Sequence, residues 1–176
     1  MLDRLDELGV RATFFCLGRL ARDNSDLIDE ITRRGHEIGV HGHEHHSHFR
    51  HGPSWVSADL REAVAVLGSR GATVRWFRPP YGHTTTATMA AARAHGLEIV
   101  LWSAWGREWA AADTANVAAR VTRRLGPGGI VLLHDGDEFN PPGSDRRVRD
   151  ALGPIVEHLA DNGLATASLS ELMAVA

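Results

Sequence analysis

The chain lacks several features that would assign it to a class of protein directly. It has one cysteine, Cys16, so no disulfide can form within the chain. No apolar run is long enough to cross a bilayer. The formal net charge of −3 and the sequence pI near 6.4 favour neither nucleic acid nor an anionic membrane as a partner. These absences predict a globular protein that binds neither a membrane nor a nucleic acid.

Two sequence signals are missing as well. No signal-peptide pattern precedes the first expected helix, which predicts a cytoplasmic protein if Met1 is the true start. The HExxH pattern of zinc proteases is also absent, because His43-Glu44 is followed by Ser47 where the second histidine is required. The length of 176 residues, with 43% hydrophobic and 23% charged residues, predicts one domain over residues 1–176.

Short apolar segments alternate with segments of helical periodicity along the whole chain. The expected strands are residues 10–17, 37–40, 76–80, 97–104, 130–134 and 164–169. The expected helices are residues 1–8, 25–34, 57–67, 86–95, 114–125 and 146–162. Because the strands are apolar on both faces, the pattern predicts an α/β fold in which helices cover about six parallel strands.

Histidines are concentrated in one stretch, residues 35–49, which holds six of the eleven in the chain. His41 and His45 are four residues apart, where a strand is expected to run into a loop. Neutral imidazole is a common ligand for zinc, but a catalytic zinc usually has three protein ligands and one open position. The stretch therefore predicts part of a metal site. The alternative is a solvated His-rich loop that binds metal adventitiously.

Polar segments follow four of the expected strands, at residues 41–48, 78–83, 105–109 and 134–138. In parallel α/β folds, binding and catalytic residues gather at the carboxyl ends of the strands. Histidine, arginine, tryptophan and acidic side chains are thus expected at the same edge of the sheet, which favours the metal site over a solvated loop.

Four motifs, in order, resemble one family: ATFF at 12–15, GHEIGVHGHEH at 35–45, FRPPYG at 77–82 and IVLLHDG at 130–136. They are similar to those of polysaccharide deacetylases with a NodB homology domain, which form carbohydrate esterase family 4. The resemblance implies a distorted (β/α) barrel. It also implies metal-dependent hydrolysis of N- or O-acetyl groups, with an acetylated carbohydrate as substrate and zinc as the favoured divalent metal.

The resemblance also implies roles for residues of the first two loops. His41 and His45 match the two metal-ligand histidines, and between them Gly42 stands where many members carry serine or threonine. Arg78 matches the arginine that orients the catalytic base. Tyr81 matches the residue whose backbone N–H helps bind the oxyanion. A rigid turn is the alternative interpretation of RPPYG, since its two prolines would form one in any case.

In the second half of the chain, His134 matches the catalytic general acid of the family and Leu132 the apolar residue that lines the acetyl-methyl pocket. Trp109 matches the tryptophan on which a sugar face packs. Glu108 stands where the family has an aspartate that tunes the catalytic histidine. A glutamate is one methylene longer than an aspartate, which predicts that this tuning contact is altered.

The family's TFDDG motif, whose aspartates supply the general base and the third metal ligand, is not in these 176 residues. Asp3 and Asp6 lie on the first expected helix and do not replace it. We therefore expect the first barrel strand to be missing, metal binding to be weak and activity to be low, in a truncated or a degenerate member. The alternatives are an inactive carbohydrate-binding protein and a related non-peptide amidohydrolase.

Overall fold

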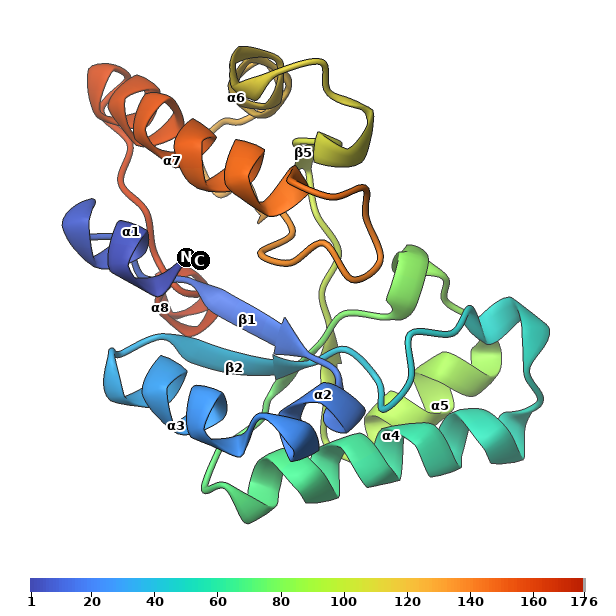
Figure 1. The fold of residues 1–176 in the computed structure, drawn as a ribbon. Helices are drawn as coiled ribbons and strands as arrows, with labels where there is room; N and C mark the ends of the chain where they lie inside the picture. Colours follow the sequence, from blue (N-terminus) through green and yellow to red (C-terminus); the bar gives the residue numbers. More distant parts are fainter. Residues whose placement is uncertain (176) are drawn as a thin grey trace. The chain divides into compact units, whose positions relative to one another are not determined.

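The computed structural model describes residues 1–175, which divide into two compact units (Figure 1). The central unit is Thr13–Leu101, and the terminal unit consists of Met1–Ala12 with the chain from Trp102 onward. The expectation of a single domain stays a prediction. No helix within residues 1–175 is both long and apolar enough to traverse a bilayer.

The central unit contains a four-stranded sheet in which every pair of neighbouring strands is parallel, as predicted. Its strands, in spatial order, are β1 (Thr13–Cys16), β2 (Glu37–Val40), β3 (Trp76–Phe77) and β4 (Glu98–Ile99). Phe15 lies opposite Gly39, and a Cβ on this glycine would come within 2.7 Å of the Phe15 ring. Glycine at this position therefore lets the aromatic ring pack over the neighbouring strand.

Four helices and two 3-10 turns complete the central unit: α2 (Gly18–Asp23), α3 (Ser25–Arg33), η1 (His48–Arg50), α4 (Pro53–Ser69), η2 (Pro80–Gly82) and α5 (Thr86–Ala94). Helix α4 begins at Pro53, whose fixed φ suits the first helical position. Its residues Val56, Leu60, Ala63 and Leu67 recur at helical spacing and are buried. They make α4 the main helical contribution to this core, and α4 contacts both α2 and α5.

The terminal unit contains a parallel pair of short strands, with Trp105 opposite Leu132. Its elements are α1 (Leu2–Glu7), β5 (Ala104–Trp105), η3 (Glu108–Ala110), α6 (Thr114–Thr122), β6 (Val131–Leu132), α7 (Ser144–Asp161) and α8 (Leu169–Ala174). Helices α6 and α7 pack on each other, and their buried residues share a core with β5: Ala104, Val117, Val121, Ala151, Ile155 and Leu159.

The predicted strand at residues 97–104 is divided in two, because β4 ends at Ile99 and β5 begins at Ala104 in a different sheet. The Arg78 guanidinium explains part of this break. Its Nε and Nη2 donate to the carbonyl oxygens of Val100 and Leu101, at 3.3 and 3.2 Å. These two carbonyls therefore bond to a side chain at the point where the strand stops.

The predicted last strand at residues 164–169 is wrong. Residues 164–168, all of which the structure describes, form no strand, and helix α8 begins at Leu169. A capping box produces this start: the Ser168 hydroxyl accepts from the Glu171 N–H, and the Glu171 carboxylate accepts from the Ser168 N–H. The Ser-x-x-Glu signature therefore outweighs the apolar pattern here.

Candidate active site

The loop that follows β2 carries His41 and His45 and is bonded to the neighbouring chain at several backbone positions. The N–H of His41 donates to the Cys16 carbonyl at the end of β1, at 2.9 Å. At the start of α2, the Gly18 N–H donates to the Gly42 carbonyl at 2.9 Å. A Cβ at Gly18 would come within 2.6 Å of the His43 ring, so glycine is required for this close approach. The loop is thus fixed by backbone contacts before any metal or substrate is considered.

A buried carboxylate on α4 holds the same loop from the other side. Asp59 accepts the backbone N–H groups of His43 and Glu44, both at 2.9 Å. Burial raises the pKa of Asp59, and the two N–H donors act in the opposite direction. Asp59 was not singled out from the sequence. The signal for it is a single acidic residue directly before Leu60, on the buried face of an amphipathic helix.

The glycine between the two candidate ligands is explained by this packing. Gly42 has φ +93°, in the left-handed region that favours glycine, and a Cβ there would lie 2.8 Å from Oδ2 of Asp59. A serine or threonine would therefore meet the carboxylate that fixes the loop. In this chain the Asp59 contacts occupy the space that such a side chain would need.

His41 and His45 lie close together, with ring centroids 5.2 Å apart. Nδ1 of His41 is 2.5 Å from the carbonyl oxygen of Arg78. Because a carbonyl oxygen only accepts, Nδ1 carries the proton and the lone pair of this ring is on Nε2, the tautomer suited to metal ligation. The chemistry of the two rings therefore fits the nitrogen part of a zinc site.

The rest of a metal-ligand set is not formed within either unit. Among residues 1–175, no three His, Cys, Asp or Glu side chains are grouped so that they could hold a metal ion. Since structural and catalytic zinc sites use three or four protein ligands, His41 and His45 fit a divalent metal as two members of a larger set.

Arg78 is buried in the central unit and is fixed on two sides. Besides donating to two carbonyls, its guanidinium carbon lies 4.2 Å from the centroid of the Phe15 ring. Burial lowers the pKa of Arg78 to about 10, so the side chain remains charged at neutral pH. The Arg78 backbone contributes separately, because its carbonyl is the one that holds the His41 ring.

Tyr81 adopts a left-handed conformation in the turn η2, with φ 60° and ψ 7°. A non-glycine residue in this region is strained by roughly 1–3 kcal/mol, and such strain is concentrated at functional sites. Tyr81 is 57% exposed, and the centroid of its ring lies 4.7 Å from that of His45. The RPPYG segment is therefore more than a rigid turn, since it places an exposed ring beside a candidate metal ligand.

The terminal unit contains a second polar cluster, centred on Glu108 and His134. Glu108 is fully buried, at 0% exposed, whereas the His134 side chain is 34% exposed. Oε1 of Glu108 accepts the His134 backbone N–H at 2.9 Å and also forms a hydrogen bond with Nδ1 of the same residue. The contact expected of the family's aspartate is therefore made by Glu108, and the extra methylene does not prevent it.

Trp109 and Arg147 contact this cluster, and Leu132 lies two residues before His134 in the chain. The Trp109 ring lies edge-on to His134 at a centroid distance of 5.6 Å, and Leu132 is buried in β6. Arg147 on α7, which no sequence motif indicates, donates from Nε to the Glu108 carbonyl at 3.3 Å. The other carboxylate oxygen of Glu108, Oε2, is buried and has no hydrogen-bond partner among the described residues.

Each unit thus gathers one group of the predicted site residues. The central unit brings together His41, His45, Arg78 and Tyr81, and the terminal unit brings together Glu108, Trp109, Leu132 and His134.

Comparison with known proteins identifies the family. The polysaccharide deacetylase family model matches residues 1–100. The chain is 35% identical over 153 residues to a chitooligosaccharide deacetylase from Bradyrhizobium sp., covering 86% of this chain and 68% of the relative. It is 31% identical over 183 residues to a peptidoglycan-N-acetylglucosamine deacetylase from Bacillus cereus, covering 98% and 80%.

The fold agrees with solved structures of the same family. A family 4 acetyl xylan esterase from Clostridium thermocellum, solved in complex with a cobalt ion, is 28% identical to this chain. The two superpose with a TM-score of 0.86 over 99% of this chain and 82% of the esterase. The chain therefore belongs to the polysaccharide deacetylase family and has the α/β, NodB-type fold of carbohydrate esterase family 4.

Proposed function

We propose that this chain is a metal-dependent hydrolase domain that removes acetyl groups from an acetylated carbohydrate, with His134 as its proton donor. The observation that carries the proposal is the pairing of His134 with Glu108. A fully buried carboxylate binds both the backbone N–H and Nδ1 of one histidine, whose ring still reaches solvent. Such a pair fixes the ring and its tautomer, as the acid of a catalytic triad does.

His134 acts as a general acid in this proposal. Glu108 engages Nδ1, which makes Nε2 the nitrogen that delivers a proton to the leaving group. The leaving group is an amine when an N-acetyl group is removed and an alkoxide when an O-acetyl group is removed. Because Glu108 is negatively charged when ionised, it stabilises the imidazolium that must form before that proton is transferred.

His41 and His45 would hold the metal, for which we propose zinc, through their ring nitrogens. A bound divalent metal would polarise the acetyl carbonyl and lower the pKa of a bound water. The Arg78 carbonyl keeps the His41 ring in the ligating tautomer, while Asp59 and Gly42 fix the loop on which both rings stand.

The remaining predicted residues contact the substrate. The Tyr81 N–H stabilises the oxyanion, and the strained turn at this residue supports a functional role. Leu132 lines the pocket for the acetyl methyl group, and Trp109 packs on a sugar face. The T-shaped contact between Trp109 and His134 supports the placing of a sugar beside the proton donor.

The general base is not assigned to any residue of this chain. The sequence contains no TFDDG motif, and within residues 1–175 no carboxylate joins His41 and His45 in a group of three. Loss of a general base lowers a rate by roughly 10²–10⁴-fold. We therefore expect little acetate release from these 176 residues alone.

The test compares this chain with an extended chain that carries a grafted TFDDG-bearing strand. Acetate release is measured from acetylated chitooligosaccharides and from acetylated xylan, with zinc or cobalt supplied. We expect release by the extended chain, little by the 176-residue chain, and loss of most release in the extended His134→Ala variant. Release unaffected by His134→Ala would contradict the proposed proton donor.

Two other outcomes distinguish the alternatives. Robust turnover by the 176-residue chain would show that another carboxylate, such as Asp135 or Asp137 beside His134, serves as the base. Oligosaccharide binding without turnover in either chain would identify an inactive carbohydrate-binding protein.

A further inference from the structure

A row of aromatic rings leads away from His45 within the central unit. The His45 and Tyr81 ring centroids are 4.7 Å apart, those of Tyr81 and His83 are 5.6 Å apart, and those of His83 and Phe49 are 4.5 Å apart. Neighbouring rings in this row are inclined to each other by 30° to 47°. We call Tyr81, His83 and Phe49 the aromatic row. Its first ring, Tyr81, neighbours the candidate metal ligand His45, and its last ring is Phe49.

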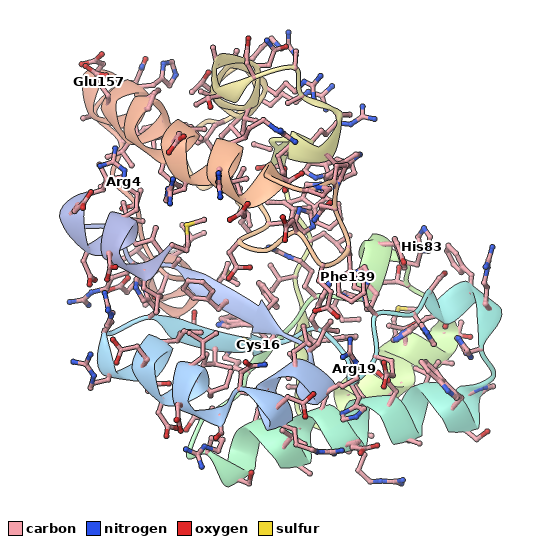
Figure 2. All side chains as sticks on the ribbon, viewed as in Figure 1. Arg4, Cys16, Arg19, His83, Phe139 and Glu157 are labelled. Atoms are coloured by element: carbon pink, nitrogen blue, oxygen red, sulfur yellow. The ribbon has the colours of Figure 1, made fainter. Side chains whose placement is uncertain are left out.

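Each ring of the row is held by its own local structure. The Ser47 hydroxyl lies 2.8 Å from Nδ1 of His83, which orients the central ring (His83 is labelled in Figure 2). Tyr81 is presented by the left-handed turn described above. Phe49 follows His48, whose buried ring is anchored 3.0 Å from the Thr88 hydroxyl. The segment that carries Phe49 is therefore anchored through the buried His48 ring, while the Phe49 ring itself is exposed to solvent.

Phe49 is 64% exposed, and only Val175 among the large hydrophobic residues of the described chain exposes a greater fraction. Exposing an aromatic ring forgoes the stabilisation that burial would provide. A single exposed apolar residue needs no explanation. The Phe49 ring does need one, because it stacks on the His83 ring, which Ser47 orients and which neighbours Tyr81. The arrangement presents apolar faces interspersed with the His83 nitrogens and the Tyr81 hydroxyl.

This combination of surfaces fits a sugar residue. A pyranose ring has an apolar face of C–H groups and a rim of hydroxyl groups, so it packs on an aromatic ring while its rim bonds to nearby polar atoms. The row carries no acidic or permanently charged side chain, so it offers no specific partner for an ionic ligand. A neutral carbohydrate is the ligand that matches it.

We propose that the aromatic row is a sugar subsite, in which Phe49 packs against a sugar residue next to, or a few residues beyond, the one whose acetyl group lies at His45. The inference rests on the proposed function and narrows its substrate class to oligosaccharides or polymers. A chain of several sugars offers further sugar residues to the aromatic row, which a monosaccharide bound at His45 does not.

The experiment is an NMR titration of the 176-residue chain with N-acetylglucosamine oligomers, from the monomer to the pentamer. Binding is measured rather than turnover, so the result does not depend on an intact general base. We expect Phe49→Ala to weaken pentamer binding by roughly 3- to 10-fold, because an aromatic contact contributes about that much. Binding of the monomer should not change, and Phe49→Trp should restore pentamer binding.

Leu27→Ala is the matched control, because Leu27 is 51% exposed on α3 of the same unit and lies outside the row. It should bind every oligomer as the unaltered chain does. Equal pentamer binding by Phe49→Ala and Leu27→Ala would overturn the subsite and leave the proposed function standing. Acetylated xylo-oligosaccharides are titrated in parallel, and failure of the unaltered chain to bind any oligomer of either series would overturn the proposed function and the subsite together.

Discussion

His41 and His45 stand on a loop that is held by several separate contacts, whereas His134 is held by one side chain. The loop that carries His41 and His45 is bonded to the end of β1, to the start of α2 and to Asp59 on α4. The His134 backbone N–H and Nδ1 of its ring both form hydrogen bonds with Glu108. Support that is spread over many contacts tolerates the loss of one of them, and support that depends on one residue does not.

The two clusters also differ in how their chemistry is completed. The terminal cluster already contains the acid and the carboxylate that orients it. The central cluster contains two imidazoles and, among residues 1–175, no carboxylate grouped with them. The terminal cluster is therefore more nearly complete than the central cluster, and variants of the two clusters should differ accordingly.

The largest effect is expected at Glu108. In the extended chain, Glu108→Gln should lower acetate release by roughly 10²–10⁴-fold, because the neutral amide neither stabilises the imidazolium nor fixes the proton on Nδ1. In the 176-residue chain, the ¹⁵N shifts of the His134 ring should report the change of tautomer independently of turnover. Glu108→Asp keeps the negative charge but shortens the side chain. Its acetate release should therefore lie between that of the unaltered extended chain and that of Glu108→Gln. Unchanged release and unchanged ring shifts in Glu108→Gln would remove the basis for the contrast.

Loss of either candidate ligand should abolish most metal binding. We expect His41→Ala and His45→Ala each to weaken zinc binding by at least about 100-fold, since a lost ligand costs at least as much as a lost outer partner. The measurement is calorimetric titration with zinc. His51→Ala is the control, whereas His48 is unsuitable because its ring is buried and anchored to Thr88. Equal losses in His51→Ala would identify an unspecific His-rich chelator.

Acid should destabilise the central unit through His48. The pKa of His48 is lowered from the ordinary 6.5 to about 4, mainly because the ring is buried and to a lesser extent because His51 lies nearby. The folded state then binds fewer protons than the unfolded state, so stability falls as the pH drops below 6.5 and the loss levels off below about 4. The loss should reach about 3 kcal/mol.

Urea unfolding at several pH values checks this prediction, with His48→Leu as the comparison. Asp59 acts in the opposite direction, because its raised pKa favours protonation in the folded state. The difference between the two proteins therefore isolates His48. A pH dependence that is identical in both proteins would show that His48 does not titrate as its burial implies.

The smallest effect is expected at Asp59, because other contacts also hold the loop. Asp59→Asn keeps one acceptor oxygen and should lower zinc affinity by about 10-fold, while Asp59→Ala should in addition destabilise the fold by roughly 1–3 kcal/mol. Calorimetric titration and urea unfolding measure the two quantities. An Asp59→Ala effect on zinc as large as that of His41→Ala would show that the loop depends on one residue after all.

The sequence by itself determined most of the alternating helices and strands, the parallel pairing of the strands and the family, although the strand expected at residues 164–169 is absent from the described chain. These features depend on local patterns: apolar segments such as residues 37–40, glycines at strand ends, and motifs such as FRPPYG that are contiguous in the chain. His41 and His45 were also predictable as neighbours, since residues four apart at a strand end share one loop.

Only the tertiary structure decided which side chains hold these residues. Glu108 and His134 are 26 residues apart, and Asp59 lies 15 and 16 residues from the N–H groups that it accepts. The Arg78 guanidinium stops a strand by bonding to carbonyls more than twenty residues away. Such contacts depend on how helices and strands pack, which local periodicity does not encode. The side chains that position the candidate ligands and the candidate proton donor were therefore visible only in the folded chain.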